Sequence, residues 1–475
     1  MILKNVLPSL LVLCLSFVTI QKGYSGEKLP NIVFILCDDL GYGDLGCYGN
    51  QLNRTPVIDQ LADKGVMFTD FYAASGLCTP SRAAFMTGCY PIRIGMDMNF
   101  RGECVCFPVD EMGLNPKEVT IAELLKQKDY KTALIGKWHL GDQKEFLPTR
   151  QGFDYFFGIP YSNDTGPGST IRKQRKIYEH PEIPLLRNET VIESPVQQET
   201  ITKRYTYETI RFIEEHKEGP FFVMLSHTMP HSPLYASPEF RGKSKNGLLG
   251  DVIEEIDWSV QKVLETLERL NLKDNTIVVF TSDNGAPPKP DERSNAPLKG
   301  YKGTVEEGGM RVPMIISWPG KIPEGKKCRQ LATMMDFYPT FGKLTGCKLP
   351  DVIIDGQDIW NLFTDPGKAI TPHAFFAYYQ LDQLQAVRTP DWKIYLPLSN
   401  QKNMWNLETR EVDLRLFNLA ADISEENELS SLQPDTVNKM QVFEKIAKNW
   451  IGNENGVTPG SRPAGYVAKP VPLTK

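Results

Sequence analysis

Five short apolar runs restrict the fold of this chain more than any other feature. They are dominated by β-branched and other large apolar residues, show no polar alternation, and cover residues 31–37, 132–135, 221–225, 276–281 and 314–318. Strands of this kind are buried on both faces, as in a parallel sheet covered by helices. Residues 251–270 lie between two of the runs and repeat apolar positions at helical spacing. The prediction is therefore an α/β fold in which a large mixed, mostly parallel sheet is sandwiched by helices.

Two helix starts can be predicted from residue type. Thr120 and Glu123 have the spacing of a capping box ahead of an apolar helical pattern. Thr55 can cap a helix that has Pro56 in its first turn and Gly65 just beyond its end.

The sequence pattern changes after about residue 365. Three short alternating segments and one amphipathic helical pattern follow, at 386–388, 392–396, 411–417 and 434–450. Alternation indicates strands with one exposed face, which is typical of antiparallel sheets. We therefore expect a main domain at 26–365 and a smaller C-terminal subdomain at 366–475 that contains an antiparallel sheet and a helix.

The first 25 residues have the pattern of a secretory signal peptide. Lys4 precedes an apolar run at 6–20, and small residues at 23–25 suit cleavage after Ser25. About 15 apolar residues interrupted by Pro8 are fewer than the roughly 20 that span a bilayer. The expectation is an exported protein, secreted or periplasmic (or lysosomal in an animal cell), without membrane insertion.

Charge excludes some classes of partner. The chain has 53 Lys and Arg against 58 Asp and Glu, a formal net charge of −5, and no run of like charge stands out. This balance gives no electrostatic case for nucleic acid or an anionic membrane as partner. Positive charge for an anionic ligand would have to be concentrated in a local site.

The nine cysteines do not have the spacing of a zinc site. Cys14 belongs to the predicted signal peptide, and Cys37 lies in an apolar run and is predicted to be a small buried residue. Cys328 and Cys347 could form a disulfide, although sequence alone does not fix the connectivity.

Polar residues follow four of the apolar runs directly. Ligands of open α/β sheets bind beyond the carboxyl ends of the strands, so these residues are expected to meet at one edge. In chain order they are Asp38 and Asp39, then Lys137 and His139, then His227 and His231, and finally Asp283 and Asn284.

Four of these residues offer hard oxygen ligands. Asp38, Asp39, Asp283 and Asn284 suit calcium or magnesium better than a transition metal. Each pair alone is also a common turn sequence. Because both pairs directly follow predicted buried strands, we favour a metal site over two turns.

The segment from Cys78 to Gly88, CTPSRAAFMTG, carries the most specific pattern. It is predicted as a loop that enters a helix, with Pro80 in the first turn. A nucleophile at Cys78 would face the positive end of the helix dipole, and Arg82 one turn later could brace it. The alternative is an inert cysteine at a helix start.

This segment resembles the C-x-P-S-R-x-x-x-x-T-G signature of the type I sulfatases, members of the alkaline phosphatase superfamily, whose cysteine is oxidised to formylglycine (3-oxoalanine). The resemblance spans nearly the whole mature chain and is greatest to the arylsulfatase A and N-acetylgalactosamine-6-sulfatase branch. Further matching motifs lie at 38–43, 136–141, 231–233, 283–285, 302–303, 307–313 and 355–356. It implies an alkaline phosphatase-like fold.

The resemblance implies a calcium site and a modified nucleophile. One Ca²⁺ ion would be bound by Asp38, Asp39, Asp283 and Asn284 together with the formylglycine made from Cys78. The hydrate of that aldehyde is the nucleophile of the family.

The resemblance also implies roles for five basic residues. Arg82, Lys137 and His139 would hold and polarise the modified residue, and His139 would take its second proton. His231 and Lys302 would contact the sulfate, and His231 would donate a proton to the leaving oxygen.

The other histidines have no role that the resemblance supports. His227 lies four residues before His231 and remains an alternative to it, although Pro233 after His231 matches the spacing of the family. His180, His216 and His373 match no motif and are expected to be surface or structural residues.

The function implied by the resemblance is hydrolysis of a sulfate ester, on a sulfated polysaccharide or glycosaminoglycan in which a galacto-configured sugar is one candidate. A formylglycine-generating maturation enzyme would be a necessary partner. Aromatic residues at 153–161 could stack on sugar rings or simply pack a loop on the core. The alternatives are a phosphonate or phosphodiester hydrolase of the same superfamily and a catalytically silent protein that binds sulfated glycans.

Overall fold

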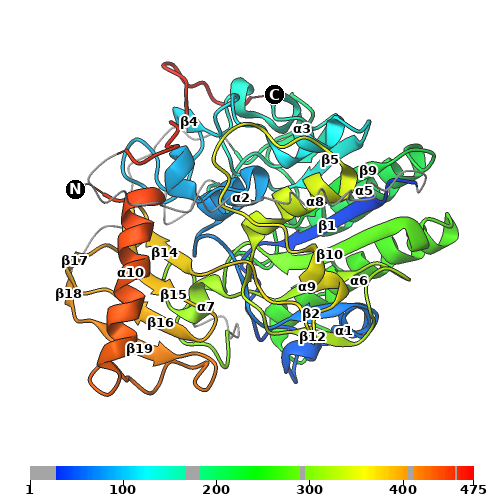
Figure 1. Cartoon of the computed structure of the whole chain (residues 1–475). Helices are drawn as coiled ribbons and strands as arrows, with labels where there is room; N and C mark the ends of the chain where they lie inside the picture. The colour runs from blue at the N-terminus through cyan, green and yellow to red at the C-terminus, as the bar shows by residue number, and fades with distance from the viewer. Residues whose placement is uncertain (1–27, 167–181, 289–294, 405–409, 455–456, 475) are drawn as a thin grey trace, which may run out of the picture.

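The computed structural model describes residues 28–166, 182–288, 295–404, 410–454 and 457–474. Its centre is a ten-stranded sheet with the order β12-β2-β11-β10-β1-β9-β5-β6-β7-β8 (Figure 1). Five consecutive strands of this sheet are parallel: β10 (Thr276–Ser282), β1 (Asn31–Cys37), β9 (Phe221–Ser226), β5 (Lys131–Gly136) and β6 (Tyr155–Gly158). The prediction of a mixed, mostly parallel sheet is confirmed.

The outer strands make the sheet mixed. On one side β11 (Met314–Ser317) runs antiparallel to β10 and to β2 (Val66–Phe68), and β12 (Lys326–Cys328) pairs with β2. On the other side β7 (Leu185–Arg187) and β8 (Thr190–Glu193) continue the sheet in antiparallel pairs. The run at 314–318 resembles the parallel strands in composition because it is also buried on both faces.

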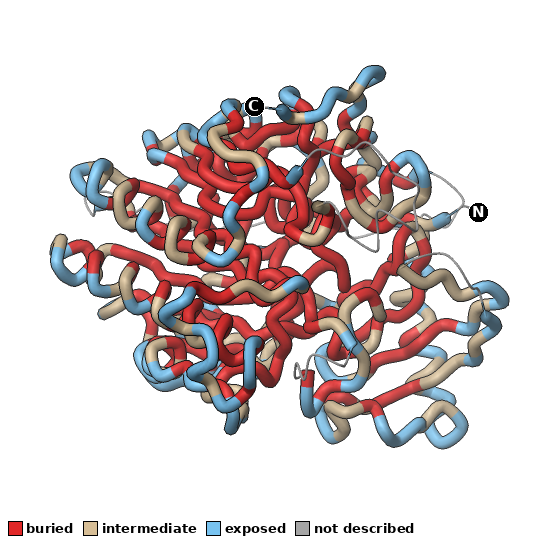
Figure 2. Tube along the Cα trace, turned by 180° about the vertical axis from the view of Figure 1, so that it is seen from behind, coloured by how far each residue is buried: buried red, intermediate tan, exposed pale blue. Residues whose placement is uncertain are grey.

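Helices cover both faces of the sheet. Phe34 of β1 points to one face, where its ring lies 4.2 Å from that of Phe85 and 5.1 Å from that of Phe337. Helices α2 (Cys78–Thr87), α3 (Ile121–Lys126), α8 (Phe337–Thr345) and α9 (Trp360–Thr364) pack there. Val33 and Ile35 point to the other face, against α1 (Pro56–Asp63), α5 (Ile201–Glu215) and α6 (Gly247–Arg269). In Figure 2 the buried residues run through the centre of the molecule, and exposed residues lie at its periphery.

Both predicted helix starts are present, but one lacks its predicted cap. Glu123 N–H donates to the Thr120 hydroxyl at 3.2 Å and Thr120 N–H donates to the Glu123 carboxylate at 2.7 Å, so the capping box is confirmed. Helix α1 begins at Pro56 as predicted, but the Thr55 hydroxyl makes no capping bond. It donates to Asp59 at 3.0 Å instead, and the Asp257 carboxylate accepts from the first N–H groups of the helix.

The C-terminal region contains the predicted antiparallel sheet and helix. The sheet has the strands β14 (Phe376–Gln380), β15 (Gln383–Arg388), β16 (Trp392–Tyr395) and β19 (Arg415–Asn418). Helix α10 (Pro434–Trp450) lies across one face of it and has the predicted bounds (Figure 1). A separate pair, β17 (Leu398–Gln401) and β18 (Arg410–Val412), extends from its edge.

Buried charges connect this sheet to the main domain. Glu307 lies in α7 (Glu307–Met310), and its carboxylate accepts a bond from Lys393 Nζ of β16 at 2.9 Å. Both side chains are fully buried. Arg311 Nη1 lies 3.3 Å from the same carboxylate, and Lys393 also lies 3.1 Å from Glu425.

The last described residues return to the main domain. Strand β20 (Gly465–Tyr466) pairs with β4 (Met112–Gly113), and Arg462 forms an ion pair with Glu118 at 2.7 Å. The domain boundary at 365/366 remains a prediction. The tail after residue 460 comes after the C-terminal sheet in the sequence but contacts the main domain.

The other predictions on composition have separate outcomes. Cys37 is buried as predicted, whereas Cys328 and Cys347 are both free thiols, so the considered disulfide is not formed. Among the described residues no helix is long and apolar enough to cross a membrane. The predicted signal peptide lies outside the described residues.

Candidate active site

The carboxyl ends of three parallel strands bring six of the predicted polar residues together. Asp38 and Asp39 follow β1, and Asp283 and Asn284 follow β10, while Lys137 and His139 follow β5. Backbone bonds hold the strand ends in register: Asp283 N–H donates to Cys37 at 3.1 Å and Lys137 N–H donates to Ser226 at 2.8 Å. All six side chains are buried. The predicted convergence at one sheet edge is therefore present in the structure.

Three basic side chains neutralise the carboxylates of this edge. Lys137 Nζ donates to Asp38, and Lys302 Nζ donates to Asp39 at 2.8 Å. Arg82 Nε donates to Asp283 at 2.9 Å. Since the three carboxylates and the three bases balance, any further cation in the site would leave it positively charged.

Cys78 is the first residue of α2 and only 2% exposed. Its sulfur, one carboxylate oxygen each of Asp38 and Asp39, and a ring nitrogen of His231 all lie within 4.8 Å of one another. Burial raises the pKa of the thiol above its ordinary value, and nearby Lys137 and Lys302 oppose this only in part. The sulfur therefore lies where the helix dipole, the carboxylates and the bases meet.

Several buried oxygens of the site suit a metal ion. Asp38 Oδ1 and Asn284 Oδ1 have no hydrogen-bond partner within the described residues, although both are buried. Asn284 Nδ2 donates to Asp39 at 2.7 Å, which leaves the amide oxygen free to bind a cation. Burial, followed by the charge of Asp38, raises the pKa of Asp283, and a bound cation would relieve this repulsion. These oxygens fit a hard divalent cation.

His139 is held as a neutral base. Its Nε2 lies 3.0 Å from the Cys106 carbonyl oxygen, and a carbonyl only accepts, so Nε2 carries the proton. Its Nδ1 is buried without a partner among the described residues. Burial, and then the charges of Lys137 and Arg82, hold the pKa of His139 well below its usual range.

His231 lies at the rim of the same cluster. Its Nδ1 lies 2.5 Å from the Ser232 carbonyl oxygen, and its Nε2 lies 3.6 Å from Asp39. Burial, and then the charge of Lys302, lower the pKa of this histidine while Asp39 opposes them. The ring is 7% exposed, so it is closer to solvent than His139.

The remaining histidines lie elsewhere. His227 Nε2 lies 3.4 Å from the Ser259 hydroxyl of α6, and burial alone lowers its pKa to about 3. His216 stacks on Phe212, and His373 forms an ion pair with Asp336 at 2.8 Å. His231 is thus the histidine that β9 contributes to the site, and His180 lies outside the described residues.

Some site residues had no predicted role. Ser226 accepts a bond from Arg82 Nη1 at 2.7 Å, and the Ser162 hydroxyl lies 3.3 Å from Lys137 Nζ. Ser226 directly ends an apolar run, which was a usable signal. Ser162 lies in a loop after β6 and had none. The aromatic residues at 153–161 are mostly buried in the core, so they pack the loop and do not form a sugar platform.

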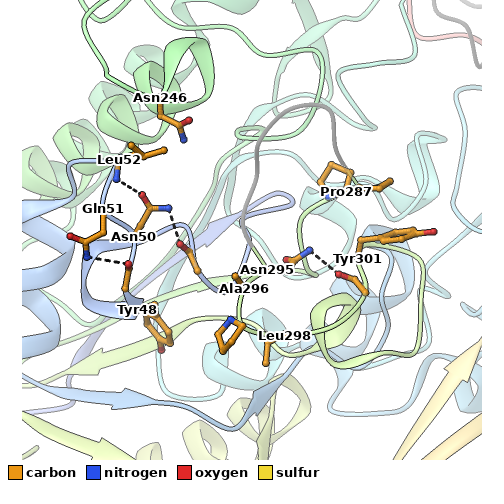
Figure 3. A pocket seen from close by; sticks show the side chains of 15 residues that line it. Tyr48, Asn50, Gln51, Leu52, Asn246, Pro287, Asn295, Ala296, Leu298 and Tyr301 are labelled. Carbon is orange, nitrogen blue, oxygen red and sulfur yellow. Dashed lines mark hydrogen bonds between the residues drawn. The ribbon is translucent and has the colours of Figure 1, made fainter. Parts of the chain in front are cut away.

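A cavity of about 850 Å³ borders the loop that carries Lys302 (Figure 3). One wall comes from residues 48–52 and the other from residues 295–301. Asn50, Gln51, Asn246 and Asn295 line it with amide groups, and Tyr301 adds an aromatic ring that is 42% exposed. Such a lining suits an uncharged polar ligand with many hydroxyl groups.

Comparison with known proteins gives matches along most of the chain. The family model described as Sulfatase matches residues 30–347, and the one described as N-sulphoglucosamine sulphohydrolase, C-terminal, matches residues 301–444. Human steryl-sulfatase is 38% identical, with 77% of this chain and 76% of that protein covered. Human arylsulfatase A is 38% identical, with 79% and 76% covered. The N-acetylgalactosamine-6-sulfatase of Rattus norvegicus is 40% identical, with 77% and 71% covered.

Solved structures agree with these matches. The crystal structure of Ps i-CgsB in complex with k-i-k-neocarrahexaose is 31% identical and has a TM-score of 0.74, with 91% of this chain and 95% of that chain covered. The PsFucS1 sulfatase from Pseudoalteromonas sp. is 29% identical and has a TM-score of 0.78, with 88% and 89% covered.

Proposed function

The chain belongs to the sulfatase family and is a sulfuric ester hydrolase, and we propose that it removes sulfate from a sulfated carbohydrate with calcium and a formylglycine made from Cys78. The observation that supports the mechanism most directly is the place of Cys78. It begins α2, and its sulfur lies within 4.8 Å of ligand atoms of Asp38, Asp39 and His231.

The residues proposed to hold calcium are Asp38, Asp39, Asp283 and Asn284, together with the modified residue 78. Two unpartnered buried oxygens and a carboxylate with a raised pKa support this set. Bound calcium would act as a Lewis acid on the sulfate oxygens, and the hydrated aldehyde would supply the attacking hydroxyl.

The basic residues would bind the anionic ester. The bases already balance the three carboxylates, so a divalent cation makes the site net positive. Lys302 and Lys137 would then neutralise charge on the sulfate, while Arg82 stays bonded to Asp283 and Ser226 and holds the site together.

Two histidines would handle protons at opposite ends of the reaction. His139 offers its free Nδ1 as a base toward residue 78, because Nε2 is bonded to the Cys106 carbonyl. His231 has Nδ1 bonded to the Ser232 carbonyl, so Nε2 is the position from which a proton can reach the leaving oxygen.

A carbohydrate substrate is supported by the amide-lined cavity beside the loop that carries Lys302, and by the relatives. The Ps i-CgsB structure is a complex with k-i-k-neocarrahexaose, and a 28% identical structure from Bacteroides thetaiotaomicron is described in terms of the metabolism of multiple glycosaminoglycans. We further propose that the chain is exported through residues 1–25 and matured by a formylglycine-generating enzyme.

Release of sulfate from defined substrates tests this proposal. Full-length protein made with a formylglycine-generating enzyme is expected to release sulfate from sulfated oligosaccharides, to lose activity with a calcium chelator and to regain it with Ca²⁺. Cys78→Ala is expected to be inactive, whereas Cys47→Ala, a cysteine outside the site, keeps the activity. Release of phosphate from phosphonate or phosphodiester substrates without release of sulfate would contradict the proposal.

A further inference from the structure

A second cavity, of about 350 Å³, lies on the C-terminal side of the loop that carries Lys302. Tyr301 and Gly303 line this cavity, whereas Lys302 between them contacts Asp39 of the candidate active site. Neighbouring Cα atoms are about 3.8 Å apart, so the cavity reaches the backbone that flanks Lys302, whose side chain enters the candidate active site. Its other wall comes from the C-terminal sheets and includes Lys402, Arg410 and Arg415.

The charge of this cavity is positive and partly uncompensated. Among the described lining residues Glu306 is the one carboxylate, against three basic side chains. Lys402 is already paired with Asp382 at 2.6 Å. Within the described residues neither Arg410 nor Arg415 forms an ion pair with a carboxylate, so two guanidinium groups remain available to a ligand.

Both arginines are fixed by contacts that leave hydrogen-bond donors free. The Arg415 guanidinium lies over the Tyr395 ring at 4.3 Å and near the Phe417 ring at 6.0 Å. Arg410 Nε donates to Gln401 at 3.1 Å, and Gln401 Nε2 donates to Gln385 at 3.1 Å. This glutamine chain orients Arg410 through one nitrogen, and its two terminal nitrogens have no bond to the part of the chain that the structure describes.

A guanidinium fork matches the planar edge of a carboxylate or the oxygens of a sulfate, and a prepositioned fork loses little freedom on binding. The exposed Tyr301 ring beside it suits the face of a sugar. The lining therefore combines groups that recognise an anion with groups that recognise a sugar.

We propose that this cavity is a subsite for a second anionic group, a sulfate or a carboxylate, on the same sugar chain as the ester at Cys78. The inference rests on the proposed carbohydrate substrate and extends it: the preferred substrate is a chain with at least two anionic groups. Arg410 and Arg415 bind the second group while the first lies at Lys302.

Calorimetric binding to the inactive Cys78→Ala protein tests the subsite without turnover. The probes are sulfated hexasaccharides from carrageenan and chondroitin sulfate, their desulfated forms, and hexagalacturonate, which carries carboxylates only. The test variant adds Arg410→Gln and Arg415→Gln. The matched control adds Lys439→Gln and Lys445→Gln, which remove the same charge from exposed positions on α10.

We expect the arginine variant to bind at least one anionic hexasaccharide at least tenfold more weakly than the parent, while the lysine control stays within twofold. Loss with the sulfated probes identifies sulfate as the ligand, and loss with hexagalacturonate identifies carboxylate. Equal affinities in all three proteins, an equal loss in the lysine control, or no binding of any probe by the parent would each overturn the subsite. The binding test needs no turnover, so the two proposals can fail separately. Arginine-dependent binding without sulfate release would contradict only the proposed function, and sulfate release without arginine-dependent binding would contradict only the subsite.

Discussion

His139 illustrates how single residues set the chemistry of this site. Its backbone is left-handed at φ 66°, as is that of Asp39 at φ 65°. Non-glycine residues pay for this conformation only where the surroundings enforce it, and such strain concentrates at functional sites. The same geometry directs Nε2 to the Cys106 carbonyl and leaves Nδ1 as the acceptor.

Replacing His139 by Ala is expected to lower kcat by about 10²- to 10⁴-fold, the usual contribution of a positioned acid or base. KM and the bound calcium should change little, because the ring is not a proposed ligand. Steady-state kinetics with a sulfated oligosaccharide and metal analysis measure both. His216→Ala, just after the end of α5 and stacked on Phe212, is the control. A His139→Ala protein that keeps more than half of kcat would remove the residue from the mechanism.

Asp39 is a second single residue on which the site should depend, because we expect it to set the affinity for calcium. Its carboxylate contacts Lys302 and Asn284, and it is a proposed ligand. Asp39→Asn removes one negative charge from the site and is expected to weaken Ca²⁺ binding at least tenfold. Calorimetric titration of metal-free protein gives the Kd, and the surface variant Asp358→Asn serves as reference. An unchanged Kd for Asp39→Asn would place the metal elsewhere.

At the scale of elements, the loop with Lys302 is held between two parts of the fold. Gly303 N–H donates to Gly76 at 2.8 Å near the start of α2, and a few residues later Glu307 contacts Lys393 of β16. Arg388 and the Tyr72 and Tyr378 hydroxyls surround the same carboxylate. The C-terminal sheet therefore helps to position the loop that reaches the sulfate.

Breaking this buried charge cluster should be costly. Glu307→Gln leaves Lys393 buried without its main partner and is expected to lower the free energy of unfolding by about 3–5 kcal/mol. Lys393→Met alone should also be costly, because the buried carboxylates of Glu307 and Glu425 then both lose this ammonium partner. Denaturant unfolding gives the values. The exposed pair Arg269–Glu214 is the control and should contribute less than about 1 kcal/mol. If disrupting either pair lowered the free energy of unfolding by the same amount, the buried cluster would stabilise the fold no more than an exposed ion pair does, contrary to this prediction.

At the scale of the whole molecule, apolar patterning predicts which strands and helices are buried, but not which elements pack next to one another. The runs at 31–37 and 276–281 and the helix at 434–450 were predicted nearly to the residue, because burial on two faces or on one leaves a plain pattern. The direction of β11, the pairing of β20 with β4 and the order of the strands depend on long-range contacts that no local pattern records.

The candidate site shows the same division. Its carboxylates, lysines and nucleophile could be predicted because they follow strands or belong to a family motif. The position of the Arg415 guanidinium depends on the packing of Tyr395 beneath it, and the contact of Ser162 with Lys137 depends on the path of a loop. Neither leaves a signal in the sequence.

The pH dependence of global stability should reveal the contact of His373 with Asp336, which anchors the chain just after residue 365. Burial alone lowers the pKa of His373, but the Asp336 carboxylate outweighs it and the net pKa is raised. The stabilisation is therefore fully present below about pH 6.5, the unfolded pKa, and is lost as the pH rises through the higher folded pKa. His373→Gln is expected to cost more stability at pH 6 than at pH 9 in denaturant unfolding. The same comparison in an Asp336→Asn background should show no pH dependence; a loss that is equal at both pH values in the parent would rule the ion pair out.

The mass of the proteolytic peptide that contains Cys78, from protein of the native source, tests the proposed chemistry most directly. An aldehyde in place of the thiol, in protein that releases sulfate in a calcium-dependent manner, is the expected result. An unmodified thiol in protein that is fully active would contradict the formylglycine mechanism. The nucleophile would then have to be sought among the residues around Cys78, which include Asp38, Asp39 and His231.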